Sequence, residues 1–130
     1  MFDQIIKWQK DRNLDKMPYF HGDECKNIIE EVCETFGFNR LYADEIMKKI
    51  YDDEIQHFCT KNDKVDAYFD ICVYSIGAIM KLGYDPMKVF EEGMKEINER
   101  TGAYDAQVGK WVKQPKKKNA YKADYAKAKL

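Results

Sequence analysis

The segment from Lys64 to Leu82 has apolar residues around almost its whole circumference when its sequence is placed on a helix. A helix of this kind is normally buried on most sides. Asp66, Asp70 and Gly77 nevertheless fall on one narrow stripe of this helix, together with Asp63 just before it. The sequence therefore predicts a largely buried helix whose acidic groups share one face.

The three aspartates of this stripe have different explanations. Asp63 fits a capping role at the start of the helix, with Asp66 three residues later in the place of a capping-box partner, and first-turn acids also favour the helix dipole. For Asp66, capping and ligand binding both remain open. Asp70 lies two turns in, where an ionised carboxylate is costly unless it is paired or coordinates a metal. No lysine or arginine lies within one helical turn of it, so we favour a ligand role for Asp70 over a buried ion pair.

A second group of acids lies in "IIEEVCETFGF", the segment from Ile28 to Phe38. The helix predicted here has one apolar face, and its opposite face presents Glu24, Glu31 and Glu34, with Glu30 at the edge. Taken alone, this segment is best explained as a solvated acidic surface.

Two predicted helices thus each offer a carboxylate pair, Glu31 with Glu34 at i, i+3 and Asp66 with Asp70 at i, i+4. If the two helices pack face to face, the four carboxylates converge. Clustered carboxylates repel one another without a metal, whereas a hard divalent cation binds oxygen ligands of this kind. Mg²⁺ is commonly shared between carboxylates and substrate phosphates, so the pattern predicts a magnesium site with a phosphorylated substrate.

The rest of the chain also has helical periodicity, and almost no segment has the two-residue period of a strand. The predicted helices are Phe2–Asp11, Asp23–Phe36, Leu41–Cys59, Lys64–Leu82 and Pro86–Arg100. A length of 130 residues with 45% hydrophobic residues suits one domain with a core of ordinary size. We expect an all-α fold, a compact antiparallel helical bundle of four to five helices.

Capping residues mark the limits of the last two predicted helices. The sequence "TKND" supplies Asn62 and Asp63 as N-caps. In "LGYDP", Gly83 ends one helix and Asp85 with the proline after it begins the next, which Gly102 is expected to close. Two long helices joined by so short a turn are expected to lie antiparallel.

Charge is distributed unevenly, although the net charge is only −1. From Gly109 to the end there are eight lysines and one acid, Asp124, so this segment carries +7 and the first 108 residues carry −8. Such an asymmetry often indicates a phosphate-bearing partner. We divide the chain into a domain over residues 1–115 and a basic C-terminal tail over residues 116–130, which is expected to lie over the surface or to be partly disordered.

The sequence indicates neither a membrane segment nor a secretory signal. No apolar run approaches the roughly 18 residues that span a bilayer, and the start "MFDQIIKWQKD" is too charged for a signal peptide. The four cysteines, at positions 25, 33, 59 and 72, include no C-x-x-C pair and predict no disulfide framework. We expect a cytoplasmic protein with no membrane partner.

Two stretches of the chain resemble the all-α nucleoside triphosphate pyrophosphohydrolases. "IIEEVCE" is similar to the Glu-x-x-Glu half of that superfamily, and "DAYFDICVYSIGAIMKLGYDPMKVFEEGMKEINERTGAYDAQVGKWVKQP" is similar to the remainder. The superfamily includes MazG, the all-α dUTPases and phosphoribosyl-ATP pyrophosphohydrolase, and the last of these and its phage relatives are the most similar. The resemblance covers about half the chain. It implies magnesium-dependent cleavage between the α and β phosphates, and a phage-encoded member would act in the host cytoplasm.

The resemblance also implies roles for individual residues. Glu31 and Glu34 match the first metal-binding pair, and Asp70 matches the aspartate that ends the second pair, which makes these three the catalytic carboxylates. Asn98 matches an asparagine that contacts phosphate or metal. Two lysines after this asparagine match family lysines that approach the phosphates: Lys110 and Lys113.

This chain departs from the family pattern at three places. Ala67 occupies the usual glutamate position of the second pair, so either Asp66 serves as the fourth metal ligand or the site has three carboxylates. A usual lysine is replaced by Thr101, with Arg100 beside it as a candidate substrate-binding residue. The two acidic pairs are also separated by an additional helix, whose acids Asp52, Asp53 and Glu54 are better explained as a solvated face.

A mechanism follows from charge. A triphosphate cannot approach an acidic cluster unless metal ions neutralise both parties, so Mg²⁺ is the expected cofactor, with Mn²⁺ as a substitute. One glutamate would act as general base for a water that attacks the α phosphorus, and lysine or arginine donors would stabilise the departing pyrophosphate. The expected partners are a nucleoside triphosphate as substrate and further copies of the chain. We expect a homo-oligomer, a dimer or tetramer, because five helices leave little room to cover the helix of Asp70 on all sides.

Two alternatives are weaker. A non-enzymatic nucleotide- or nucleic-acid-binding module would use the tail, where Lys122, Lys127 and Lys129 alternate with Tyr121 and Tyr125, but no recognition motif accompanies them and the acidic body opposes binding. A zinc site would use His21, Cys25, His57 and Cys59, whose spacing matches no familiar zinc motif.

Overall fold

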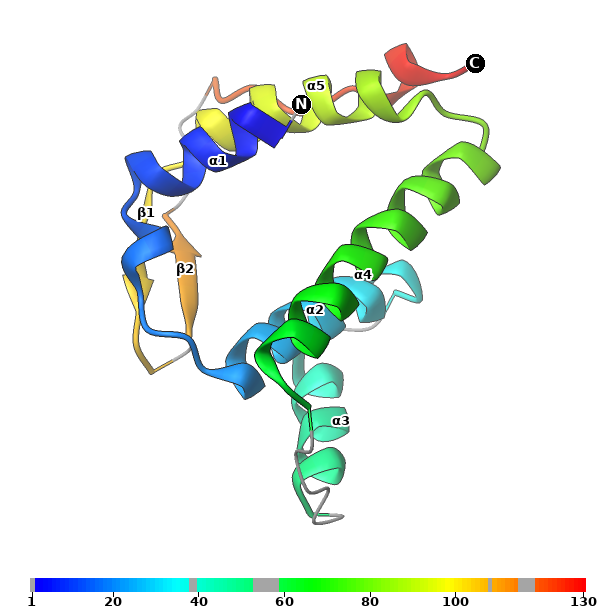
Figure 1. Cartoon of the computed structure of the whole chain (residues 1–130). Coiled ribbons are helices and arrows are strands. Elements are labelled where there is room, and N and C mark those ends of the chain that lie inside the picture. Colours follow the sequence, from blue (N-terminus) through cyan, green and yellow to red (C-terminus); the bar gives the residue numbers. More distant parts are fainter. Residues whose placement is uncertain (1, 38–39, 53–58, 108, 115–118) are drawn as a thin grey trace. The chain divides into compact units, whose positions relative to one another are not determined.

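The computed structural model describes residues 2–37, 40–52, 59–107, 109–114 and 119–130 (Figure 1). These residues form α1 (Phe2–Asp11), α2 (His21–Thr35), α3 (Arg40–Asp52), α4 (Lys61–Lys81), α5 (Pro86–Asn98) and a two-stranded sheet of β1 (Gly102–Asp105) and β2 (Lys110–Lys113). Short 3₁₀ helices follow α1 at Leu14–Lys16 and lie near the C-terminus at Tyr125–Ala128. The mostly helical class that the sequence predicts is confirmed, whereas the sheet was not predicted.

The described residues divide into two compact units, and the positions of these units relative to one another are not determined. Unit 1 comprises Met1–Asp15, Phe58–Thr101 and Lys113–Leu130, and unit 2 comprises Lys16–His57 and Gly102–Val112. The division into a 1–115 domain and a tail stays a prediction.

The start of α4 shows why its predicted boundary was three residues late. Thr60 is the N-cap: its hydroxyl oxygen accepts the N–H of Asp63 at 3.1 Å, and the Asp63 carboxylate accepts the N–H of Thr60 at 2.9 Å. Asp63 is therefore the second member of a capping box and not the N-cap itself. The capping role predicted for Asp63 is confirmed, but its position within the cap was wrong.

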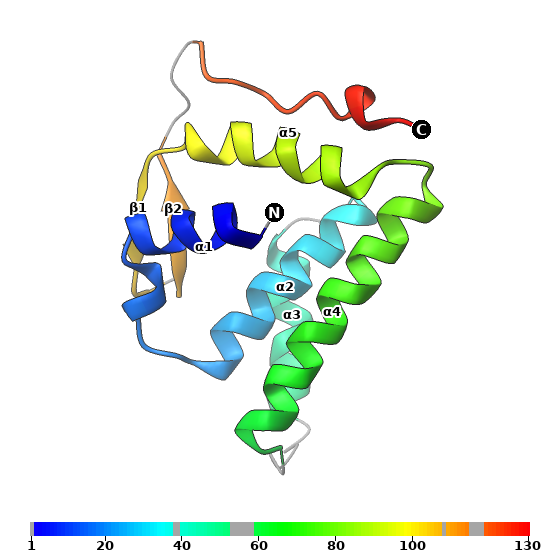
Figure 2. The same cartoon turned by 45° about the horizontal axis from the view of Figure 1, so that its top comes forward.

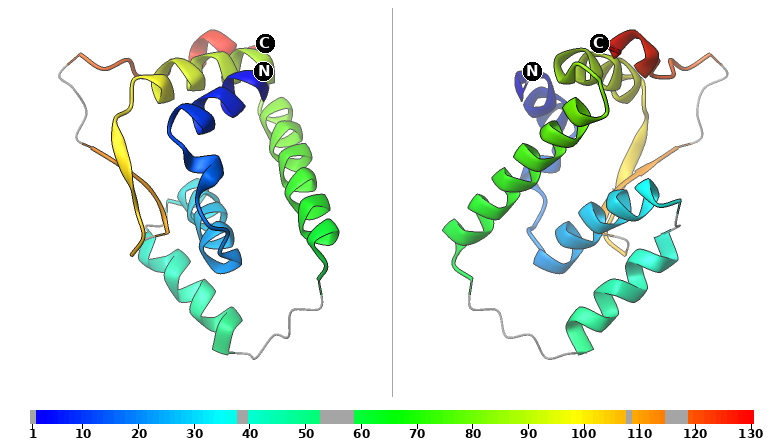
Figure 3. Two further views of the ribbon diagram at one scale, coloured as in Figure 1. Left: turned by 60° about the vertical axis from the view of Figure 1, so that its left-hand side comes forward. Right: turned by 90° about the vertical axis from the view of Figure 1, so that its right-hand side faces the viewer.

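The turn between α4 and α5 has the predicted residues. Gly83 follows the end of α4 with φ +87°, a conformation that favours glycine, and the Asp85 side chain accepts the N–H of Met87 at 2.9 Å as N-cap of α5. The two helices nevertheless diverge from this turn and do not lie side by side (Figures 1 and 3). The antiparallel packing expected from the short turn was therefore wrong, and the 3₁₀ helix near the C-terminus makes a larger contact with α5 than α4 does.

The contact between α1 and α5 centres on Trp8. Its indole N–H donates to the carbonyl oxygen of Ile97 at 3.0 Å, and its ring is buried together with Met94 of α5. The indole thus adds a second donor to a carbonyl at the end of α5 that also accepts the N–H of Arg100 at 3.2 Å. This contact holds the end of α5 to α1 within unit 1.

Residues 119–130, here called the C-terminal segment, run along α5 (Figure 2). Three glutamates spaced along one face of α5 accept its backbone N–H groups: Glu99 accepts that of Tyr121, Glu96 that of Ala123 at 2.9 Å and Glu92 that of Asp124 at 3.2 Å. The Tyr121 hydroxyl also donates to Glu92. For these residues, the structure shows the first of the two predicted alternatives, a segment lying over the surface.

The end of the C-terminal segment is fixed to the α4–α5 turn. The N–H of Asp85 donates to the carbonyl oxygen of Ala128 at 2.8 Å, and the N–H of Leu130 donates to that of Gly83 at 3.0 Å. Ala128 is fully buried. The segment therefore has backbone partners at both ends, which an unattached lysine-rich tail would lack.

The apolar residues of α4 are exposed, which differs from the prediction of a largely buried helix. No described residue of α4 is buried, and Val65, Phe69 and Tyr74 are 67%, 63% and 78% exposed. Periodicity identified this helix as apolar but does not specify what covers it. Unit 1 by itself leaves an apolar surface on α4 of the kind that usually contacts another surface.

Unit 2 is built around α2, which packs against α3 (Figure 3). Cys33 of α2 and Ala43 and Met47 of α3 are buried between them, so Cys33 behaves as a small hydrophobe, as expected. The Lys26 ammonium lies 4.0 Å from the Asp44 carboxylate and links the two helices on the outside. The predicted continuation of α3 beyond Asp52 to residue 58 lies outside the described residues, and Cys59 is not helical.

The β1–β2 hairpin contacts the first half of α2. The backbone of Gly109 lies so close to Asp23 that a side chain there would collide with the carboxylate, and the Asn27 amide donates to the carbonyl oxygen of Gly109 at 3.4 Å. Gly102 was expected to close the last helix. It instead begins β1, where a Cβ would collide with the Val112 carbonyl oxygen and the Trp111 ring, and α5 already ends at Asn98.

A helix long and apolar enough to cross a membrane does not occur among the described residues.

The pKa of Glu92 predicts how acid weakens the contact of the C-terminal segment with α5. A hydrogen bond from the Lys95 ammonium and a second from the Tyr121 hydroxyl lower the pKa of Glu92 from 4.5 to about 2. A lowered carboxylate pKa stabilises the fold above the unfolded value, and this contribution is lost as the pH falls from 4.5 to about 2. Glu92→Gln should lower the melting temperature near neutral pH, and the difference from the parent should shrink across that window.

Thermal melts of both proteins from neutral pH down to about pH 2 test this prediction. Glu91→Gln, which removes the same charge from an exposed position of α5, is the control and should change the pH profile less. Parallel profiles for Glu92→Gln and the parent through the acid range would contradict the interpretation.

Candidate functional site

Glu31 and Glu34 lie one turn apart on the exposed side of α2, as their spacing predicts. Burial first, and then the neighbouring Glu34 carboxylate, raise the pKa of Glu31 above 4.5. The ionised pair is thus unfavourable by itself, because two like charges are held close together. A cation between the two carboxylates would relieve this repulsion.

Lys110 of β2 lies beside this pair. Its ammonium group lies 3.0 Å from both carboxylate oxygens of Glu30, although the two residues are 80 positions apart. Lys110 also lowers the pKa of Glu31 by its charge, which opposes the larger effects of burial and Glu34. Within unit 2 the fold therefore brings a predicted phosphate-binding lysine next to a predicted metal-binding pair.

The donor set of α2 suits magnesium in part. Glu31 and Glu34 offer carboxylate oxygens, the ligands that Mg²⁺ prefers, and Mg²⁺ is commonly bound by one or two carboxylates and several waters. Within either unit, no described group of three or more His, Cys, Asp or Glu side chains is arranged to hold a metal ion. The second predicted carboxylate pair belongs to unit 1.

Asp66 and Asp70 are exposed on α4 in unit 1. Within unit 1 no described residue forms a hydrogen bond or an ion pair with the carboxylate of Asp70, so this unit offers no support for the buried ion pair weighed for it. The convergence of Asp66 and Asp70 with Glu31 and Glu34 stays a prediction, because the two units are not placed relative to one another.

Two of the predicted substrate-binding residues, Asn98 and Arg100, line one polar hollow of about 630 Å³ at the C-terminal end of α5. The other lining residues are Arg12, Glu99, Thr101, Asn119 and Ala120. Lys113 is exposed at the end of β2, and the next residue donates its N–H to the carbonyl oxygen of Thr101 at 2.8 Å. Unit 1 therefore places three of the four predicted phosphate-binding residues in one region.

Arg12 was missed by the sequence analysis, because it belongs to no motif and lies some 86 positions before Asn98. Its guanidinium group lies 4.4 Å from the centre of the Trp8 ring and donates to the carbonyl oxygens of Trp8 and Arg100, both at 3.3 Å. Arg100 in turn donates to the Glu96 carboxylate at 2.9 Å. Both guanidinium groups are held by the ends of α1 and α5, so the hollow has fixed cationic walls.

The structure brings together two of the four residues that the zinc alternative requires. His21 and Cys25 lie together, with Sγ of Cys25 3.6 Å from Nε2 of His21, and the Tyr19 hydroxyl lies 2.7 Å from Nδ1 of the same ring. His57 lies outside the described residues, and Cys59 is exposed in unit 1. The described side chains therefore offer two of the four ligands in one place.

The nucleic-acid alternative requires tyrosines that are available for stacking. Tyr121 instead donates to Glu92, with the Lys127 ammonium 5.9 Å from its ring centre, and Tyr125 lies against α5 next to Gly93. These contacts weaken the stacking surface that the alternative needs. Of the solvated acids predicted after α3, Asp53 and Glu54 lie outside the described residues.

No protein-family model, curated protein or solved structure matches this chain. The resemblance to the all-α pyrophosphohydrolases therefore stays a prediction.

The Glu31–Glu34 pair predicts a specific response to magnesium. In EDTA, Glu31→Gln should leave the melting temperature unchanged or raise it, because a carboxylate whose pKa is raised disfavours folding in its ionised form. The parent should gain about 2.7 kcal/mol of stability at a hundredfold excess of Mg²⁺ over its dissociation constant, and the variant much less. Thermal melts with EDTA and with Mg²⁺ measure both effects.

Glu24→Gln is the matched control for this experiment. Burial and then the neighbouring Asp23 raise the pKa of Glu24, so this variant should also keep or gain stability in EDTA. It should retain the full magnesium response. A magnesium response that is undiminished in Glu31→Gln would rule out this pair as a metal site.

Proposed function

We propose that this protein is a magnesium-dependent nucleoside triphosphate pyrophosphohydrolase with a MazG-like arrangement of its helices. It would cleave its substrate between the α and β phosphates to give a nucleoside monophosphate and pyrophosphate. The observation that supports this most is the placement of Lys110 beside Glu31 and Glu34 within unit 2. A carboxylate pair for a hard cation next to a lysine for a phosphate suits phosphoryl chemistry.

The acidic residues would bind the metal ion and activate water, and the basic residues would bind the phosphates. Glu31 and Glu34 would hold Mg²⁺ with Asp70 and Asp66, and the ion, when bound, supplies charge neutralisation at the phosphates. One carboxylate of the α2 pair would accept a proton from the attacking water as that water's oxygen bonds to the α phosphorus. The bond from this phosphorus to the bridging oxygen breaks, and the pyrophosphate leaves with that oxygen.

Cationic donors would stabilise the leaving pyrophosphate. Lys110 is tied to Glu30 and so has a fixed position beside the pair, whereas Lys113 is exposed and able to follow a substrate. Arg100 and Asn98 offer planar hydrogen-bond donors in one hollow. Donors of this kind act most strongly when they are already oriented before the charge develops.

We further propose that the protein is a homo-oligomer, a dimer or tetramer, that buries the apolar surface of α4. The exposed apolar residues of this helix support the proposal: Val65, Phe69, Ile71, Val73, Tyr74 and Met80. Continuous apolar surface of this kind is costly to leave in water.

Asp70→Asn tests the catalytic role of α4. The exposed position of Asp70 predicts that the metal-free variant folds as well as the parent, while pyrophosphate release from nucleoside triphosphates should fall by orders of magnitude. Asp63→Asn is the control, because it weakens the capping box: it should lower the melting temperature and leave turnover of the folded protein intact. Turnover in Asp70→Asn equal to that of the parent would refute the assignment.

Sedimentation velocity at micromolar protein concentration tests the assembly. The parent should sediment as a dimer or tetramer, and Phe69→Lys, which places a charge on the exposed apolar surface, should sediment as a smaller species. A parent that is monomeric at this concentration would contradict the proposal.

A further inference from the structure

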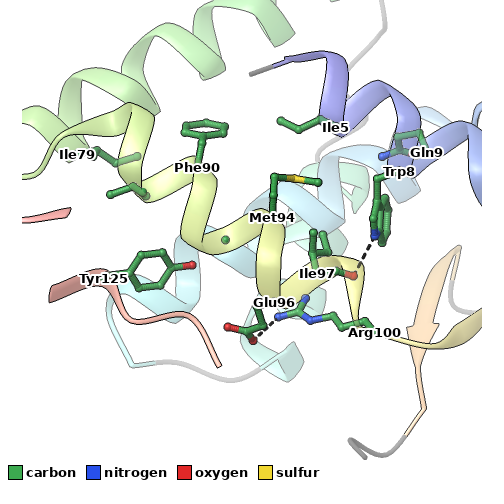
Figure 4. Close-up of a pocket in the computed structure, with 12 residues that line it drawn as sticks. Ile5, Trp8, Gln9, Ile79, Phe90, Met94, Glu96, Ile97, Arg100 and Tyr125 are labelled. Carbon is green, nitrogen blue, oxygen red and sulfur yellow. Dashed lines mark hydrogen bonds and ion pairs between the residues drawn. The ribbon is translucent and has the colours of Figure 1, made fainter. Parts of the chain in front are cut away.

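An apolar hollow of about 390 Å³ lies beside α5 in unit 1 (Figure 4). Phe90, Met94 and Ile97 project from α5 toward Ile5 and Trp8 of α1, and Tyr125 of the C-terminal segment lies at another side of α5. Its volume falls within the roughly 300–1,000 Å³ of small-molecule sites, which are usually apolar with a few polar groups. The two aromatic side chains on the α1 side of this lining, Trp8 and Phe90, suit a flat ring.

Gln9 adds a specific polar group to this lining. Its side-chain amide makes no hydrogen bond to any described residue. An amide offers two donors and an acceptor, which match the mixed donor and acceptor edge of a heterocyclic base. A saturated hydrocarbon ligand would leave this amide unsatisfied, so the lining favours a flat heterocycle over a lipid chain.

Arg100 lines this apolar hollow and also the polar hollow described above. The polar hollow is lined by the guanidinium groups of Arg12 and Arg100 and by one carboxylate, Glu99. Arg100 is also paired with Glu96, which lines the apolar hollow. The Glu99 carboxylate already accepts the N–H of Tyr121. Paired guanidinium groups with nearby amide and hydroxyl side chains are well suited to phosphate oxygens.

We propose that the two hollows form one mononucleotide-binding site, in which the apolar hollow binds the base and the polar hollow binds the phosphates. Trp8 and Gln9 contact the base, Arg12 and Arg100 bind the phosphate oxygens, and Asn119 gives the C-terminal segment a part in the site. The idea that this site binds the substrate of the enzyme rests on the proposed hydrolase function. Nucleotide binding to the site is measurable without hydrolysis.

Trp8 provides a direct readout. The sequence has two tryptophans, so Trp111→Phe leaves Trp8 as the sole indole. In EDTA, nucleoside monophosphates of the four common bases should quench its fluorescence with saturation. The matching nucleosides and ribose 5-phosphate should bind more weakly, because each fills one hollow. The proposal would be overturned if none of the four nucleotides quenches the fluorescence with saturation at millimolar concentration. It would also be overturned if ribose 5-phosphate binds as tightly as the nucleotide.

Gly93 allows the apolar hollow to be filled without harming the helix. A Cβ at this position would lie 3.5 Å from the Tyr125 hydroxyl oxygen, an ordinary contact, and alanine or leucine favours a helix over glycine. Gly93→Ala should melt higher than the parent. Gly93→Leu, confirmed as folded by its melting curve, should raise the nucleotide dissociation constant about tenfold or more. An unchanged dissociation constant in folded Gly93→Leu would overturn the assignment of the base.

Arg12→Gln tests the polar hollow, with Lys10→Gln as the control that removes the same charge from an exposed position of α1. Arg12→Gln should weaken the nucleoside monophosphate about tenfold or more and leave the nucleoside within about twofold. Lys10→Gln should leave both unchanged. An equal loss of nucleotide affinity in Arg12→Gln and Lys10→Gln would mean that only the overall charge matters, and it would overturn the role of Arg12.

Hydrolysis assays with Mg²⁺ separate this inference from the proposed function. Nucleotide binding that depends on Gly93 and Arg12, in a protein that releases no pyrophosphate, would support the site and reject the hydrolase. Hydrolysis with an unchanged KM in Gly93→Leu and Arg12→Gln would support the hydrolase and reject the site.

Discussion

The carboxylates along one face of α5 determine most of the arrangement of unit 1. Glu92, Glu96 and Glu99 accept backbone N–H groups of the C-terminal segment, which has no sheet partner there to accept them. Glu96 also accepts a hydrogen bond from Arg100, so one carboxylate joins the C-terminal segment to the polar hollow. Loss of this contact would release the segment and the orienting partner of Arg100 together. The basic end of the chain is thus a structural part of unit 1.

The sequence predicted those parts of the fold that depend on neighbours along the chain. The bounds of α1 agree with its apolar period, and Gly83 and Asp85 mark the α4–α5 turn because helix ends need a left-handed residue and a side-chain acceptor. The hairpin was missed because strands of four residues are too short to show a two-residue period. The docking of the C-terminal segment was left open because its partners on α5 lie more than twenty positions away.

The candidate site also has parts that depend on neighbours along the chain, which the sequence predicted, and parts that depend on distant residues, which it did not. The spacing of Glu31 and Glu34 alone placed them on one turn of α2. The ion pair of Lys110 with Glu30 depends on the hairpin and was not predicted, since the family resemblance implied only a phosphate-binding role for Lys110. Arg12 had no local signal at all. The burial expected for Asp70 failed for a related reason, since an all-round apolar pattern identifies surface that must be covered but not the molecule that covers it.

Charge balance explains why the α2 cluster suits a divalent cation better than an organic one. Lys110 compensates one of three glutamates, so Glu30, Glu31, Glu34 and Lys110 together leave two negative charges. A second ammonium group would balance only one of them, and the raised pKa of Glu31 shows that the two carboxylates disturb each other as they stand. One doubly charged ion balances both at once and binds carboxylate oxygens directly. A phosphate can then approach this face of α2, because the ion and Lys110 together neutralise the negative charge that it would otherwise meet.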